Sequence, residues 1–350
     1  MEFGAVFIGI IPTPGEYAGQ GGEDMPDRAI VVNGYAYPSI DLELLAETAP
    51  NLTFVSAFSY GITEDGHLIS LEDAPIVQTA GRFGAKSLMV FTALTQDGSF
   101  NSDLAGRVFE DPKIQDRLIE EMLANIKEKG MYGVDFDFEF IYPQYKEAYA
   151  AFIEKTRVRF NAEGYVVLAA LAPKTSGEQK GLLYEGHDYA LVGEAANLVL
   201  LMTYEWGYTY GPPMAVAPIN QVRRVLDYGV TQIEPARILM GIPNYGYDWT
   251  LPFVQGESKA RLIGNEEALW LADYYGAGIQ FDELAQSPFF YYWDAEGRQH
   301  EVWFEDERSI RAKLSLVDEY GLAGVSYWNL MRPFRVNWEV LREMFYVVKL

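Results

Sequence analysis

Eight short apolar segments recur along the 350-residue chain, and stretches with helical periodicity lie between many of them. The segments are residues 31–37, 52–60, 87–94, 133–140, 165–172, 197–204, 238–245 and 324–330. The intervening amphipathic stretches include residues 116–129, 145–163, 219–230 and 307–320. Strands that alternate with helices are typical of β–α units and a parallel sheet. Eight such units predict an α/β fold of the (β/α)8 TIM-barrel type.

A doubly wound open sheet is the structural alternative, but no Gly-rich phosphate fingerprint follows the first segment. The spacing between the seventh and eighth segments is too long for one crossover. Within it, residues 289–293 and 301–304 flank Asp-Ala-Glu-Gly, a pattern that predicts an antiparallel hairpin. We therefore expect a small α+β insertion at residues 247–307, which would form one wall of a cleft over the barrel mouth. The remaining divisions are a leader or loop at residues 1–30 and the barrel itself at residues 31–246 and 308–350.

Composition excludes several functions. The net charge of −23 argues against nucleic-acid binding and against docking on anionic lipid, because both need clustered basic residues. The absence of cysteine excludes disulfides, thiolate metal ligands and a Cys nucleophile. With 24 Tyr and 7 Trp, the chain is rich in flat rings, which suit both a large core and the apolar faces of sugars.

The N-terminal apolar run at residues 5–11 is broken by Pro12 and Pro14 and lacks a basic region, so we expect no signal peptide. No stretch approaches the length that spans a bilayer. These features leave the compartment and the oligomeric state open.

Asp135, Asp137 and Glu139 alternate with apolar residues in the fourth segment, so a strand places all three on one face. Clustered buried carboxylates repel one another and resist desolvation, a cost usually offset by catalysis or metal binding. Glu139 lies nearest the C-terminal mouth, where barrel enzymes react, and is the natural general acid. Asp137 can orient a substrate group and share a proton with Asp135.

A structural acid cluster without function and a metal site of carboxylate oxygens are the alternatives. Against a metal, we expect no His near the three acids: His67, His187 and His300 are scattered along the sequence, and we expect them to be ordinary surface residues. We therefore expect neither a metal nor another cofactor. Several other strand ends carry polar or aromatic residues that fit a substrate site. These candidates are Tyr35, Tyr204, Glu205, Trp206, Asn244, Tyr245 and Trp328.

The segment 133–139, Gly-Val-Asp-Phe-Asp-Phe-Glu, resembles the DGxDxDxE signature of glycoside hydrolase family 18, the chitinase-like enzymes. Residues 202–205, Met-Thr-Tyr-Glu, resemble the Met-x-Tyr-Asp element of that family, and Trp328 matches its tryptophan beneath the bound sugar. The resemblance covers nearly the whole chain from Val31 onward. Two positions depart from the pattern: Tyr132 replaces the first Asp of the signature, and Glu205 replaces the Asp after the sixth-strand Tyr.

A narrower likeness, at residues 202–208, 241–249 and 327–330, is to the spore-germination branch, whose N-acetylglucosaminidases act on cortex peptidoglycan. Many of those carry N-terminal LysM repeats; about thirty residues precede the first predicted strand here, and we expect no such module. The resemblance implies a glycan containing N-acetylglucosamine as substrate, from peptidoglycan or chitin. It also implies a spore-associated or cytoplasmic (mother-cell) location, and an extracellular location stays open.

The family mechanism is substrate-assisted. By resemblance, Glu139 protonates the leaving oxygen while the substrate's 2-acetamido oxygen attacks the anomeric carbon. Asp137 holds the acetamido N–H, Asp135 tunes the charge of Asp137, and Tyr204 hydrogen-bonds the acetamido carbonyl. Glu139 then activates water, which gives retention. A chitinase, and a carbohydrate-binding barrel with weak catalysis, are the functional alternatives.

Overall fold

A computed structural model describes residues 26, 28–95 and 99–350. Within these residues, eight parallel strands close into a barrel, because β1 pairs with both β2 and β14. The barrel strands are β1 (Ala29–Ala36), β2 (Phe54–Ile62), β4 (Lys86–Phe91), β5 (Gly133–Phe136), β6 (Val166–Leu171), β7 (Leu198–Leu201), β8 (Ile238–Pro243) and β14 (Gly324–Trp328). The predicted TIM barrel is therefore confirmed. The apolar run at residues 5–11 and nearly all of the predicted leader lie outside the described residues.

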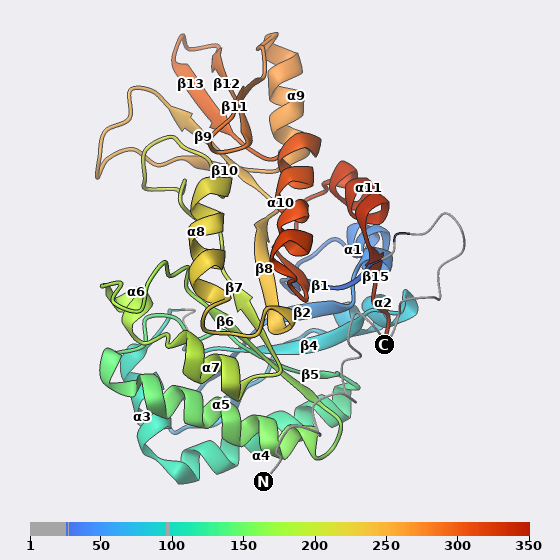
Figure 1. The fold of residues 1–350 in the computed structure, drawn as a ribbon, viewed down its shortest axis with the longest axis vertical. Helices are drawn as coiled ribbons and strands as arrows, with labels where there is room; N and C mark the ends of the chain where they lie inside the picture. The colour runs from blue at the N-terminus through green and yellow to red at the C-terminus, as the bar shows by residue number, and fades with distance from the viewer. Residues whose placement is uncertain (1–25, 27, 96–98) are drawn as a thin grey trace.

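Helices pack around the outside of the barrel (Figure 1). They are α1 (Leu42–Thr48), α2 (Ala74–Arg82), α3 (Ser102–Glu110), α4 (Pro112–Lys129), α5 (Lys146–Asn161), α6 (Leu182–Glu185), α7 (Tyr189–Ala195), α8 (Ile219–Gly229), α10 (Glu307–Tyr320) and α11 (Arg335–Met344). Two short strands extend the sheet: β3 (Leu68–Ile69) is antiparallel to β2, and β15 (Tyr346–Val347) is parallel to β1. In the described chain, no helix is long and apolar enough to cross a membrane.

Helix α4 illustrates how the sequence sets these boundaries. The Asp111 side chain accepts a hydrogen bond from the Lys113 N–H and caps the N-terminus, and Pro112 occupies the first turn, where no N–H is needed. Gly130 adopts a left-handed conformation with φ of 67° and ends the helix.

Alternate strand residues form two apolar layers. One layer, which includes Phe54, Leu88, Val90, Leu168 and Leu239, fills the barrel interior, and the other packs the strands against the helices. A row of polar side chains crosses the same interior: Asn33 donates to Ser326 Oγ at 3.0 Å, and Ser56 Oγ lies 3.0 Å from both Asn33 Oδ1 and Asp135 Oδ2. This row supports Asp135, the deepest carboxylate of residues 133–140, which we call the acidic segment.

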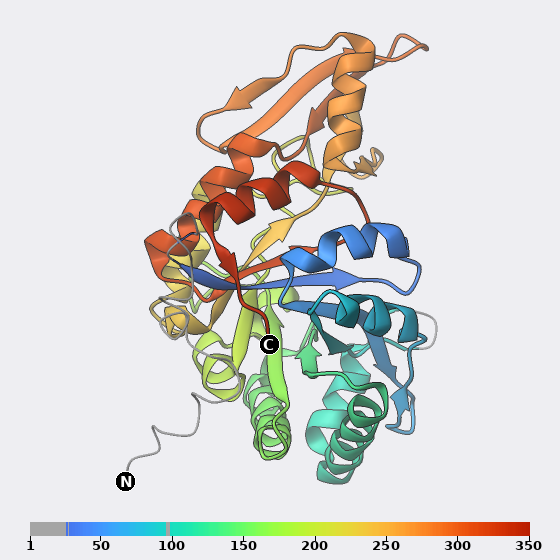
Figure 2. The ribbon, with the colours of Figure 1, turned by 90° about the vertical axis from the view of Figure 1, so that its right-hand side faces the viewer.

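A second sheet projects from one end of the molecule between β8 and α10 (Figure 2). Its described strands, in spatial order, are β10 (Arg261–Ile263), β9 (Gly246–Thr250), β13 (Gln299–Trp303), β12 (Ser287–Trp293) and β11 (Gln280–Asp282). Helix α9 (Asn265–Tyr275) covers one face, where Phe290, Tyr292 and Val302 meet Leu271. The predicted α+β insertion between the seventh and eighth barrel strands, with β12 and β13 as its antiparallel hairpin, is confirmed.

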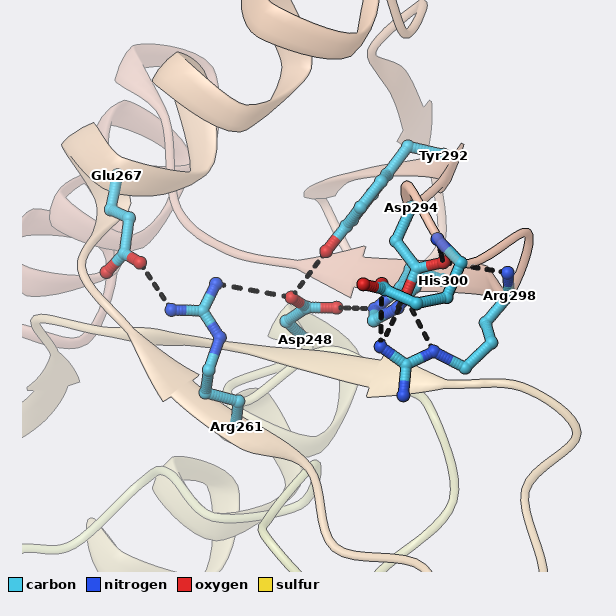
Figure 3. Close-up of polar contacts among 8 residues, drawn as sticks. Asp248, Arg261, Glu267, Tyr292, Asp294, Arg298 and His300 are labelled. Carbon is cyan, nitrogen blue, oxygen red and sulfur yellow. Dashed lines mark hydrogen bonds and ion pairs between the residues drawn. The ribbon is translucent and has the colours of Figure 1, made fainter.

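A polar network joins the strands of the insertion (Figure 3). Buried Asp248 on β9 accepts a hydrogen bond from Tyr292 on β12 at 2.8 Å and pairs with Arg261 on β10 at 3.3 Å. Its other oxygen lies 2.7 Å from Nδ1 of His300, whose Nε2 lies 3.2 Å from Asp294. The expectation that His300 is a surface residue is therefore wrong, because β-sheet pairing brings carboxylates to both sides of its ring.

Candidate active site

The acidic segment leaves regular strand geometry earlier than predicted. Strand β5 ends at Phe136, and one further ladder bond follows, from the Asp137 N–H to the Phe91 carbonyl at 3.0 Å. Phe140 has a left-handed φ of 56°, a conformation that costs energy for a residue with a Cβ and often marks a functional site. The Ser102 hydroxyl donates to the Phe140 carbonyl at 2.7 Å and holds this turn. The predicted strand over residues 133–140 is therefore too long: its ladder bonds stop at Asp137, and the chain turns directly after Glu139.

Asp135 lies deepest and is fully buried. Desolvation raises the pKa of its carboxyl to about 6, although Tyr35 and Ser56 act in the opposite direction by hydrogen bonding. Among the described residues, Asp135 Oδ1 and the Tyr35 hydroxyl have no hydrogen-bond partner of good geometry.

Asp137 and Glu139 lie nearer the mouth. Desolvation, followed by the charges of Glu139 and Asp135, raises the pKa of Asp137 well above its usual range. Asp137 Oδ1 is buried and has no hydrogen-bond partner among the described residues. Glu139 is half-buried, and desolvation together with the charge of Glu205 raises its pKa to about 7. Glu139 can therefore carry a proton near neutral pH.

A cavity of about 300 Å³ opens above these acids. It is lined by Tyr35, Asp137, Glu139, Ala170, Pro173, Leu183, Tyr184, Leu200, Met202, Tyr204, Glu205 and Trp328. The structure thus brings six of the predicted site residues into one cavity: Tyr35, Asp137, Glu139, Tyr204, Glu205 and Trp328. Asp135, on β5, is fully buried beneath them.

Trp328 forms an aromatic platform with rings from the first two barrel strands. Its ring centroid lies 5.4 Å from Tyr35, 5.9 Å from Tyr37 and 5.1 Å from Phe58, all in edge-to-face geometry. Such packing fixes the indole plane, and a flat indole suits the apolar face of a sugar. Sequence reasoning missed Tyr37 and Phe58, although both stand near the C-terminal ends of predicted strands, where barrel sites form.

Tyr204 and Glu205 follow β7. Tyr204 is buried, and Gly241 leaves room for its ring: a Cβ there would come within 2.7 Å of Tyr204 Cε1. Glu205 has a left-handed φ of 67°, and its carboxylate accepts hydrogen bonds from Tyr245 and, at 3.0 Å, from Tyr247. Desolvation raises the pKa of Glu205, while the two tyrosine bonds oppose that rise.

The other predicted candidates lie around this cavity. Tyr245 contacts Glu205, as above, and Trp206 lines a neighbouring cavity. Asn244 is buried and donates from its amide to the carbonyls of Asn329 at 2.8 Å and Arg332 at 2.9 Å. The structure therefore gives Asn244 contacts between β8 and the loop after β14, and it does not bring Asn244 into the lining of the cavity.

His187 supports the acidic segment from behind. It is fully buried: Nδ1 accepts the Ala172 N–H at 2.8 Å, so Nε2 carries the proton and donates to the Phe138 carbonyl at 2.8 Å. Desolvation lowers the pKa of His187 to about 4, which keeps the ring neutral. The expectations that His187 lies at the surface and that no histidine approaches the acidic segment are wrong. Residues 49 positions apart meet here, which no local pattern could reveal.

Among the described residues, no group of three or more His, Cys, Asp or Glu side chains has an arrangement that could hold a metal ion. The cavity instead combines an acid of raised pKa, a buried carboxylate oxygen that has no hydrogen-bond partner among the described residues, a tyrosine and a half-buried indole. These groups suit recognition of a polar ring and proton transfer to it.

The family model for glycosyl hydrolases family 18 matches residues 97–332, more than half of the chain. The chain is 42% identical to the cortical fragment-lytic enzyme of Bacillus subtilis (strain 168) over 93% of this chain and 76% of the relative. Its fold is similar to the Bacillus cereus spore cortex-lytic enzyme SleL, with a TM-score of 0.89 and 38% identity over 94% of this chain and 77% of that structure. It is also similar to a chitinase from Chromobacterium violaceum, with a TM-score of 0.82 and 25% identity over 90% and 99% of the two chains. The chain therefore belongs to glycoside hydrolase family 18 and is a glycosidase.

Proposed function

We propose that this glycosidase cleaves β-1,4 bonds after N-acetylglucosamine by substrate-assisted catalysis with retention, and that its substrate is spore-cortex peptidoglycan or fragments of it. The observation that carries the proposal is the position of Glu139: its pKa is raised to about 7 in the same cavity as Asp137, Tyr204 and Trp328. A carboxylic acid that is protonated near neutrality can donate to the leaving oxygen.

The substrate supplies the nucleophile in this mechanism. The sugar lies on Trp328, and its 2-acetamido oxygen attacks the anomeric carbon as Glu139 protonates the departing oxygen. Tyr204 donates to the acetamido carbonyl and aligns it for attack. Glu139, now ionised, takes a proton from a water molecule. That water attacks the anomeric carbon from the same face from which the leaving group departed, so the configuration is retained.

Asp137 holds the acetamido N–H and stabilises the positive charge that develops on the substrate. Its Oδ1 is buried without a partner among the described residues, as expected of an acceptor that waits for a substrate donor. Asp135 lies below and contributes negative charge, held by its contact with Ser56. The two acids act as a pair whose protonation is shared.

The choice of polymer rests on the relatives. The cortical fragment-lytic enzyme and SleL, each with about three quarters of its length covered by this chain, are named for action on spore cortex, and we extend that substrate and a spore-associated location to this chain. The chitinase from Chromobacterium violaceum supports chitin oligomers as the second candidate.

We also propose that the insertion, residues 247–307, forms one wall of the cleft. The Tyr247 hydroxyl, on the first strand of the insertion, donates to Glu205 in the cavity at 3.0 Å. The barrel domain then comprises residues 31–246 and 308–350.

Digestion of purified cortex peptidoglycan and chitin oligomers side by side tests the proposal, with products identified by mass. Reducing-end N-acetylglucosamine from cortex is the expected result, and chitobiose from chitin alone would overturn the choice of polymer. Glu139→Gln should abolish hydrolysis of either polymer, and a chelator should leave the wild-type rate unchanged.

A further inference from the structure

Glu139 and Glu205 line the same cavity, but only Glu205 has hydrogen-bond donors of its own. Its Oε1 accepts the hydroxyls of both Tyr245 and Tyr247. No described residue donates a hydrogen bond to the Glu139 carboxylate. A donor stabilises the ionised form of the acid that it contacts, so the two acids differ in how strongly they hold a proton.

The two tyrosines are fixed by packing that does not involve the acids. Both are buried, and their ring centroids lie 5.7 Å apart in edge-to-face geometry. Tyr247 lies on β9, where it pairs with Leu262 of β10 and Trp303 of β13. Desolvation raises the pKa of the hydroxyls of Tyr245 and Tyr247, so both keep their protons and act as donors to Glu205.

The remaining titratable and charged groups around the two acids come from several elements. They are Tyr35 on β1, Asp135 on β5, Asp137 directly after β5, Tyr184 on α6, Tyr204 after β7 and Arg224 on α8. The charge of Glu139 raises the pKa of Asp137, so acids crowd the Glu139 side. Arg224 lines the neighbouring cavity, which Glu205 borders and Glu139 does not. These charges act in the same direction as the tyrosine hydrogen bonds.

We propose that Tyr245 and Tyr247 are positioning residues that keep Glu205 ionised and so place the single proton of the acid pair on Glu139. Two close acids in a partly dry cavity resist ionising together, and their shared proton stays on the acid with fewer donors. The inference rests on the proposed function, in which the leaving oxygen receives this proton. Because Tyr247 belongs to the insertion, the insertion then helps to prepare the general acid.

The position of the proton can be measured without a substrate. Glutamate is labelled with carbon-13 at its carboxyl carbon, and NMR spectra are recorded across a pH series; Glu139→Gln and Glu205→Gln identify the two signals. In the wild type, we expect Glu205 to lose its proton at lower pH than Glu139. Tyr245→Phe combined with Tyr247→Phe keeps both rings and removes both donors. The ratio of proton on Glu139 to proton on Glu205 should then fall roughly tenfold.

Tyr292→Phe is the matched control, because it removes a tyrosine hydrogen bond to buried Asp248 within the same insertion sheet. It should leave both titrations unchanged. Kinetics give a second measurement: the loss of the two donors should lower kcat/KM near neutral pH by roughly three- to tenfold. In a Glu205→Gln background the same loss should change kcat/KM by less than about twofold, because no second acid competes for the proton.

Three results would overturn the inference: loss of the proton from Glu139 first in the wild type, unchanged titrations in the double Tyr→Phe variant, or an equal loss of kcat/KM in the Glu205→Gln background. The same shift in Tyr292→Phe would also overturn it, because the effect would then come from a loosened insertion. If the titrations are as expected but the wild-type enzyme cleaves no glycan that contains N-acetylglucosamine, the proton placement stands and the proposed function fails.

Discussion

The Nε2 of His187 lies 2.8 Å from the carbonyl oxygen of Phe138, the residue between Asp137 and Glu139. The other ring nitrogen accepts from the Ala172 N–H, directly after β6. One neutral imidazole therefore ties the end of β5 to the end of β6 and fixes the peptide that orients the two acids.

We predict that His187→Ala lowers kcat roughly tenfold while KM changes little, because misplacement of Glu139 weakens catalysis more than binding. The lost hydrogen bonds should also reduce the free energy of unfolding by about 1–3 kcal/mol. Steady-state kinetics and urea unfolding measure the two effects. His187→Gln keeps one donor and should recover part of kcat. A purely structural role would leave kcat of the folded fraction at the wild-type value.

The pH profile should report the coupling between Glu139 and Glu205. Because Glu139 acts as an acid and its pKa is raised to about 7, kcat/KM should fall as the pH rises through about 7. The charge of Glu205 contributes to that raised pKa, so Glu205→Gln should move the falling limb to lower pH. Glu319→Gln, which removes a charge that pairs with Arg223 on the helical layer, is the control. An unmoved limb in Glu205→Gln would contradict the coupling.

Burial of Asp135 should make the protein less stable at high pH. Desolvation raises the pKa of this carboxyl from 3.8 to about 6, so the folded protein binds the proton more tightly than the unfolded chain. The stabilisation is full below pH 3.8 and is lost as the pH rises through 6, an effect of about 3 kcal/mol. Urea unfolding at pH 5 and pH 8 should show a smaller difference for Asp135→Asn than for wild type. Asp116→Asn, at an exposed position, should keep the wild-type difference.

The network around His300 should stabilise the insertion. His300→Leu leaves buried Asp248 without one of its partners, and we expect a loss of about 1–3 kcal/mol in the free energy of unfolding. His67 contacts Glu121 at 2.6 Å but is about half exposed, so His67→Gln should cost less than about 1 kcal/mol. Equal losses in the free energy of unfolding for the two variants would contradict the claim that the buried network stabilises the insertion.

The barrel and its insertion could be predicted because their signals are local. Each barrel strand is an apolar run of its own, and the long interval before β14 leaves room for an extra sheet. Alternation alone predicts that Asp135, Asp137 and Glu139 share one face. The structure then brings candidates from separate strand ends, such as Tyr35 and Trp328, into the lining of one cavity.

The features that sequence reasoning missed depend on contacts between distant residues. Strand β5 ends at Phe136, and the chain turns at Phe140, whose left-handed conformation is not signalled by its residue type. Asn244 resembles a cleft residue in sequence, yet the carbonyls of Asn329 and Arg332 take its amide protons. The burial of His187 and His300 likewise follows from strands and loops that only the folded barrel and insertion bring together.

The requirement for a 2-acetamido group tests the central claim most directly. Hydrolysis of an N-acetylated glycan is compared with that of the same glycan carrying a free hydroxyl or amine at C2, under conditions where both bind. Our account predicts that the wild-type enzyme cleaves only the N-acetylated glycan, because the acetamido oxygen is the nucleophile that Asp137 and Tyr204 hold in place. Comparable cleavage rates for the two glycans would contradict it.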